Sequence, residues 1–240
     1  MSQRRSDTDT TNSDCLRKVY KAQNSRGQNS TEMAALNHPT AHTASSTALL
    51  VCDLQNMILG MVDESKRPKL IDATKALLAA ARANGVQIFH CVIDPELDPH
   101  PTSKLVDRWA TTFKPTLAAN PVLGQEPPEI AAPAGASNER EFTVGRRPGH
   151  VSALRSNGLT PALLKEKYGV TSLVVCGIST SGVVLSTVKQ AWDDDFIVTV
   201  VEEACIDPSP ELHKLLMEKT FLSGAWVMNV EEAVSLLGSK

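Results

Sequence analysis

Short runs of apolar residues recur along the chain from about residue 47 onward, separated by longer segments of mixed polarity. Their length and their richness in Val, Ile and Leu predict strands that are buried on both faces. The clearest runs are residues 47–53 (TALLVCD), 86–93, 172–176 (SLVVC) and 197–201 (IVTVV), and shorter strands are expected at residues 141–144 and 226–228.

The segments between these runs follow the period of an amphipathic helix. In residues 68–84, Leu70, Leu77 and Leu78 recur at helical spacing and Gly85 provides a C-terminal stop. Thr160 followed by Pro161 has the pattern of an N-cap and first helical position, and this helix should end near residue 169. Further helices are expected at residues 181–192, 209–221 and 230–237.

Because apolar strands alternate with amphipathic helices, the sequence predicts an α/β protein. The expected fold is a three-layer α/β/α, doubly wound, mostly parallel sheet of the Rossmann-like type. We assign it to residues 46–238. Residues 1–45 are rich in Ser, Thr, Asn, Gln and Arg, lack apolar periodicity, and are expected to form a disordered tail.

Composition and charge narrow the classes of partner. The 240 residues are 42% hydrophobic and carry 24 basic and 27 acidic residues, for a net charge of −3. This balance gives no support for nucleic-acid binding, and no apolar run approaches the roughly 18 residues of a membrane span. A signal-peptide core is absent, and Asp7, Asp9 and Asp14 disfavour a transit peptide, so we expect a cytoplasmic protein without membrane partners.

The cysteines are scattered and form no C-x-x-C pair. Several lie inside apolar runs, which predicts reduced core thiols rather than disulfides. They are Cys15, Cys52, Cys91, Cys176 and Cys205.

Two predicted strand ends carry candidate chemistry. Asp53 ends the first strand, in V-C-D-L-Q-N, and the turn at residues 177–183 (GISTSGV) joins a strand to a helix. Doubly wound sheets bind ligands at the carboxyl ends of strands, and backbone N–H groups at a helix start can hold a carboxylate or an oxyanion. Both features also have plain structural interpretations, as a turn residue and as capping residues.

Three blocks of sequence resemble the isochorismatase-like hydrolases of the cysteine hydrolase superfamily, over about residues 47–237. They are ALLVCDLQNMIL, GISTSGVVLSTVKQAWDDDF and VVEEACIDPSPELHKLL. The resemblance implies a parallel sheet in which the first and fourth strands are adjacent, which would place Asp53 beside the turn at residues 179–183.

The resemblance also implies catalysis by an Asp, a Lys and a Cys. Asp53 fills the Asp position, whereas the Cys position holds Val183, which has no nucleophile. The Lys segment is shifted by about two residues, so Gly145, Arg146 or Arg147 aligns with it. The turn itself, with an expected cis bond between its second and third residues, would bind substrate; its residues after Gly177 are Ile178, Ser179, Thr180, Ser181, Gly182 and Val183.

Two alternative chemistries follow from nearby residues. Ser179, Thr180 or Ser181 would be a nucleophile if a histidine such as His150 approached in space. The Asp98-Pro99-His100 segment is faintly similar to the metal site of nicotinamidases, but a further histidine ligand is not evident. We therefore expect no metal and no cofactor.

Two functions are consistent with these residues. The first is hydrolysis of a small, anionic, cyclic or amide-type substrate with Asp53 as acid or base and no Cys nucleophile, as in true isochorismatases. The second is a catalytically silent binding or scaffold protein. A closed salt bridge between Asp53 and Arg146 would favour the second. The family also implies a homo-oligomer, for which the apolar face of the helix after Ser181 is a candidate interface.

Overall fold

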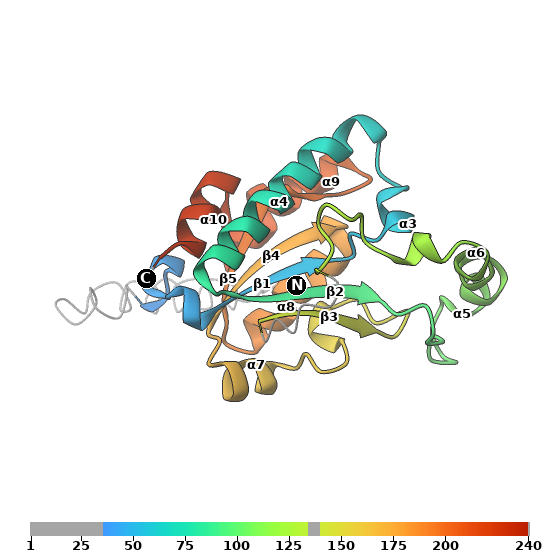
Figure 1. The fold of residues 1–240 in the computed structure, drawn as a ribbon, viewed down its shortest axis with the longest axis horizontal. Coiled ribbons are helices and arrows are strands. Elements are labelled where there is room, and N and C mark those ends of the chain that lie inside the picture. Colours follow the sequence, from blue (N-terminus) through green and yellow to red (C-terminus); the bar gives the residue numbers. More distant parts are fainter. Residues whose placement is uncertain (1–35, 134–139, 240) are drawn as a thin grey trace, which may run out of the picture.

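The computed structural model describes residues 36–133 and 140–239, which form one parallel sheet with helices on both faces (Figure 1). The sheet order is β3-β2-β1-β4-β5-β6, and each neighbouring pair of strands is parallel. The predicted fold class is therefore confirmed. The strands are β1 (Thr47–Cys52), β2 (Gln87–Ile93), β3 (Glu141–Arg146), β4 (Ser172–Ile178), β5 (Ile197–Ile206) and β6 (Trp226–Met228).

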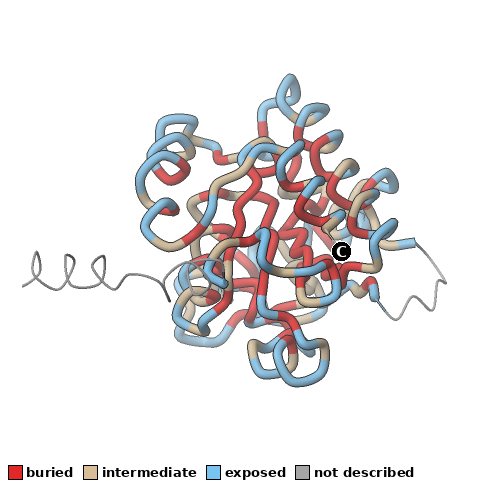
Figure 2. The backbone as a smooth tube through the Cα atoms, turned by 90° about the vertical axis from the view of Figure 1, so that its left-hand side faces the viewer, coloured by how far each residue is buried: buried red, intermediate tan, exposed pale blue. Residues whose placement is uncertain are grey.

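Long helices cover the two faces of the sheet. On one face, α4 (Arg67–Asn84) and α10 (Val230–Leu237) contact each other and β5. On the other face lie α7 (Pro161–Tyr168) and α8 (Leu185–Asp193) (Figure 1). Buried backbone runs through the central strands, and exposed residues lie on the outer turns of the helices (Figure 2). Shorter helices are α3 (Asn56–Leu59), α5 (Val106–Arg108), α6 (Lys114–Ala119) and α9 (Pro210–Leu215).

The strand order reverses between β1 and β4. From this point β2 and β3 extend the sheet one way, and β5 and β6 extend it the other way. In such a sheet the connections that leave the two strands at the reversal go to opposite faces, which leaves room for a site outside the carboxyl ends of these strands. Asp53 and the turn after β4 both lie at this edge, directly after the paired residues Cys52 and Gly177.

The structure differs from the predicted element bounds in several places, and β3 and β4 each continue two residues past their predicted ends. β5 continues to Ile206, because its register against β4 shifts between Val175 and Gly177 and accommodates polar residues that had marked the predicted strand end. The helix expected from residue 181 begins with a wider π-type turn, Thr180–Val184, before α8. The helix expected at residues 209–221 is α9 followed by a π-type turn, Leu216–Thr220.

The apolar face of α8 is not available as an interface. Thr187, Val188 and Ala191 on this helix are buried within the chain itself. The expectation that this face joins two copies is therefore wrong, because the helix uses it to cover its own sheet. Among residues 36–133 and 140–239, no helix has the length and apolar character needed to cross a bilayer.

Part of the segment assigned to the tail packs on the domain. Residues 36–45 include a short 3-10 turn, Pro39–Ala41, and a second one, Ala44–Ser46, follows. A hydrogen bond of 2.8 Å joins His42 to Thr171, and the Trp226 indole donates to the carbonyl of Asn37. The remainder of the expected tail, residues 1–35, lies outside the described residues, as does Cys15.

Candidate active site

Asp53 lies immediately after β1, in a backbone conformation that is unusual for a residue with a side chain. Its φ is +58°, and its N–H donates to the carbonyl of Cys91 on β2 at 2.9 Å. On the other side of β1, Gly177 has a φ of +137°, and a Cβ there would come within 2.0 Å of the Cys52 carbonyl oxygen. Only glycine lets β4 pass β1 this closely. The backbone therefore places residue 53 at the same edge of the sheet as the turn that follows β4.

Arg146, the last residue of β3, forms a bidentate ion pair with Asp53. Its Nη1 and Nη2 donate to the two carboxylate oxygens at 2.6 and 2.5 Å, and its Nε donates to the carbonyl of His150 at 2.8 Å. Asp53 is 5% exposed and Arg146 is 2% exposed. Arg147, another candidate for the Lys position, follows the end of β3 and is exposed. Both oxygens of the candidate acid are thus engaged by a buried cation.

The electrostatics of the pair combine burial and charge. Burial raises the pKa of the Asp53 carboxyl, and the hydrogen bonds and charge of Arg146 oppose this shift without cancelling it. For Arg146, burial favours the neutral form, but the Asp53 carboxylate raises the pKa of the guanidinium overall. A carboxyl that retains its proton more strongly than usual has the property required of a general acid.

The turn after β4 has the expected cis peptide bond, between Ile178 and Ser179. Two of its N–H groups, which were expected to hold a substrate oxygen, already have partners in the chain. The N–H of Ser181 donates to the Asp207 carboxylate at 2.7 Å, and that of Gly182 donates to the Ser179 carbonyl at 3.1 Å. Ile178, Thr180 and Val183 are buried, and Ser179, Ser181 and Gly182 are partly exposed.

Asp207 and His213 contact the turn after β4, although no pattern in the sequence selected them. Asp207 follows β5 and also accepts from the N–H of Ser209, the N-cap of α9. His213, on α9, contacts the hydroxyl of Thr180 at 2.8 Å. Burial lowers the pKa of His213, which favours the neutral imidazole.

The histidine beside the turn is therefore His213 rather than His150. The backbone of His150 instead holds Arg146, as described above. Thr180, the hydroxyl that meets His213, is fully buried, so this contact positions the turn and does not present a nucleophile to solvent.

The residues considered for metal binding do not converge. Asp98 forms an ion pair with Lys114 at 2.7 Å, and His100 contacts Thr102. Within the described parts of the chain, no three His, Cys, Asp or Glu side chains are grouped to hold a metal ion. The described cysteines are buried free thiols, and burial raises the pKa of Cys176 and Cys205, which disfavours the reactive thiolate.

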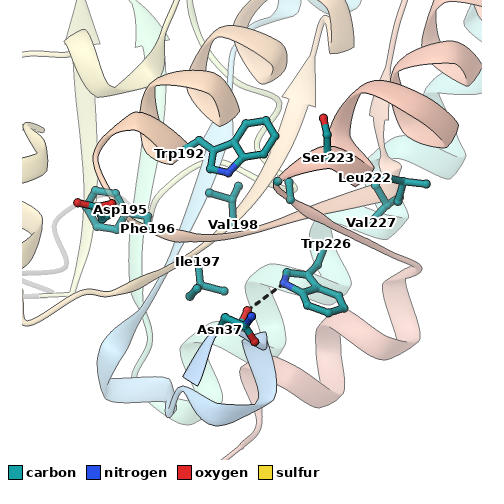
Figure 3. Close-up of a pocket in the computed structure, with 12 residues that line it drawn as sticks. Asn37, Trp192, Asp195, Phe196, Ile197, Val198, Leu222, Ser223, Trp226 and Val227 are labelled. Carbon is teal, nitrogen blue, oxygen red and sulfur yellow. Dashed lines mark hydrogen bonds between the residues drawn. The ribbon is translucent and has the colours of Figure 1, made fainter. Parts of the chain in front are cut away.

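Open pockets lie elsewhere on the molecule. A pocket of about 570 Å³ lies near the start of β5 and beside β6, between the indoles of Trp192 and Trp226 (Figure 3). A second, of about 460 Å³, is lined by Lys66, Lys69 and His213 among others. Neither of these two pockets is lined by Asp53 or Arg146.

The fold and the position of this site define a class of protein: a doubly wound α/β domain with a buried Asp–Arg pair at the carboxyl edge of its sheet. The chain matches the isochorismatase domain model over residues 47–232 and belongs to that family. The isochorismatase family protein YecD of Escherichia coli O157:H7 is 28% identical over 198 residues, which cover 81% of this chain and 97% of that protein.

Solved structures share the fold. An isochorismatase family protein from Burkholderia thailandensis superposes with a TM-score of 0.61 at 22% identity, covering 81% of this chain and 97% of its own. A cysteine hydrolase from Pseudomonas syringae pv. phaseolicola 1448A has a TM-score of 0.65 at 15% identity, covering 82% and 94%. At these identities the likeness concerns the fold.

Proposed function

We propose that this protein is a catalytically silent member of the isochorismatase family, which keeps the fold and a binding edge for small anionic molecules but does not hydrolyse them. The observation that carries the proposal is the closed Asp53–Arg146 ion pair, with both partners buried and both carboxylate oxygens engaged. A substrate would have to break this pair before it could take a proton from Asp53 or give one to it.

Two further features support a silent site. The position at which the family resemblance expects the thiol nucleophile holds Val183, which is 2% exposed. The N–H of Ser181, which would stabilise a developing oxyanion, is already saturated by the carboxylate of Asp207. The chain thus supplies its own anion where a hydrolase would receive that of its substrate.

A second candidate is hydrolysis with Asp53 as general acid and no Cys nucleophile. The specific observation in its favour is the raised pKa of Asp53, which suits proton donation to a vinyl ether or a similar leaving group. In this case Arg146 would hold an anionic, cyclic or amide-type substrate after releasing Asp53. This mechanism requires the pair to open in every catalytic cycle.

An activity screen with isochorismate, nicotinamide and N-carbamoyl amides separates the two candidates. The wild type is compared with Asp53→Asn and with Asp98→Asn, which removes a charge from an exposed ion pair. The silent assignment predicts equal background rates for all three proteins. Turnover that is lost in Asp53→Asn and kept in Asp98→Asn would establish the hydrolase instead.

We also propose that the described domain, with the packed segment that precedes residue 46, acts as a homo-oligomer in the cytoplasm. Size-exclusion chromatography with light scattering measures the mass in solution. A mass equal to one chain of 25.8 kDa at micromolar concentration would contradict the oligomer.

A further inference from the structure

A strap of chain, residues 121–130, is tied to the residues that follow Asp53. The Gln55 side chain donates to the carbonyl of Gly124 at 2.7 Å and to that of Ile93 at the end of β2 at 2.9 Å. Asn56 donates from its backbone to Gln125 at 2.7 Å and from its side chain to Val122 at 2.9 Å. The strap therefore lies against the carboxyl ends of β1 and β2, at the edge that holds the closed ion pair.

A buried histidine of β2 also contacts the strap. His90 on β2 is fully buried, and its two ring nitrogens face two carboxylates. Its Nδ1 lies 2.8 Å from Glu126 on the strap, an ion-pair contact outside hydrogen-bond geometry, and its Nε2 lies 3.0 Å from Glu141 on β3. Glu141 is held in turn by Arg82 of α4 at 2.7 and 3.1 Å.

The charge balance of this cluster depends on one proton. Two carboxylates and one guanidinium leave one negative charge, which a protonated His90 neutralises. Glu126 relies on His90 in particular, because its side chain is 5% exposed and its Oε1 has no hydrogen-bond partner. Loss of the proton would leave a buried carboxylate without a counter-charge, which is strongly unfavourable.

We propose that the proton on His90 latches the strap, and that its loss frees the strap from Gln55 and Asn56 and opens the edge at Asp53. The latch would thus regulate ligand access to the site of the proposed function. The latch itself does not depend on whether that site hydrolyses its ligand. The charged groups around the latch are Glu126 of the strap, Glu141 of β3, Arg82 of α4 and, near Glu126, Asp53.

The direction of the pH response follows from the environment of His90. Burial alone would lower the pKa of His90, but the carboxylates of Glu126 and Glu141 raise it above its usual value. A histidine whose pKa is raised by folding stabilises the folded state fully below the unfolded value of about 6.5. The latch should therefore hold in mildly acidic solution and loosen as pH rises through the pKa of folded His90.

Hydrogen–deuterium exchange of the full chain tests the latch. Exchange of strap peptides is divided by that of β4 at each pH, which removes the intrinsic pH dependence of exchange. We expect the protection of the strap relative to β4 to fall by up to about tenfold per pH unit between the unfolded pKa of about 6.5 and the pKa of folded His90, and to level off at higher pH. In His90→Gln the strap should exchange fast at every pH.

Two further variants keep the result interpretable. Glu126→Gln removes the carboxylate without touching the sheet, so it should abolish the pH dependence even if His90→Gln folds poorly. His100→Gln changes an exposed histidine and should keep the wild-type profile. A wild-type strap whose relative protection does not change with pH, or a Glu126→Gln profile equal to that of the wild type, would overturn the latch. Neither outcome depends on turnover, because the exchange experiment tests the latch and the activity screen tests the proposed function.

Discussion

Removal of one partner of the Asp53–Arg146 pair should destabilise the protein far more than removal of both. In Asp53→Asn the guanidinium of Arg146 remains buried without its counter-charge, as does the carboxylate of Asp53 in Arg146→Met. Breaking a buried ion pair in this way costs about 3–5 kcal/mol. The double variant Asp53→Leu/Arg146→Met leaves no buried charge, and we expect it to lie within about 1 kcal/mol of the wild type.

Equilibrium urea unfolding, followed by tryptophan fluorescence, measures these differences as shifts in midpoint at constant m-value. Asp53→Leu completes the double-mutant cycle; with single costs of about 3–5 kcal/mol each and a double cost within about 1 kcal/mol, the coupling between the two positions should be at least about 5 kcal/mol, a factor of more than about 1,000 in the unfolding equilibrium constant. Asp98→Asn, which breaks the exposed pair with Lys114, is the matched control and should stay close to the wild type. A cost below about 1 kcal/mol for Asp53→Asn would refute a closed, buried ion pair.

Three further predictions concern the surroundings of the pair. Gly177→Ala should prevent folding because its Cβ would lie 2.0 Å from the Cys52 carbonyl oxygen, whereas Gly158→Ala, also at positive φ but with nothing within 4 Å, should cost only about 1 kcal/mol in urea unfolding. Asp207→Ala should cost about 1–3 kcal/mol by leaving the Ser181 N–H unpaired, and a cost near zero would show that water replaces the carboxylate. Burial alone would raise the pKa of Glu141, but Arg82 and His90 lower it overall. The free energy of unfolding should therefore fall as pH drops through the pKa of folded Glu141. In Glu141→Gln this loss of stability at acid pH should be smaller in thermal melts.

The alternation of strands and helices could be predicted because each element buries apolar residues whose spacing is visible within a short segment of the sequence. The residues at which the strands end were harder to predict. β5 extends past residue 201 because a register shift against β4 absorbs Glu202 and Glu203, and such a shift depends on the partner strand. The same limit applied to Arg146 and Arg147: the predicted strand ended at residue 144, so the sequence did not show that Arg146 is the last strand residue and that Arg147 follows it.

Residues of the candidate site could be predicted only where they directly follow a run of apolar residues that forms a buried strand. Asp53 and the turn at 177–183 were selected because each follows a buried strand. Asp207 and His213 reach the turn from β5 and α9 across a distance in sequence that no periodicity spans. The cluster at His90 has the same character, because its charges come from α4, β2, β3 and the strap.

A single-turnover experiment tests the central claim most directly. The protein is mixed in excess over isochorismate, and separately over an N-carbamoyl amide, and samples are quenched over time, so that a single conversion per site is detected. The closed ion pair predicts that wild type and Asp53→Asn form product at the same background rate. Conversion of one equivalent of substrate by the wild type, with none by Asp53→Asn, would contradict the account.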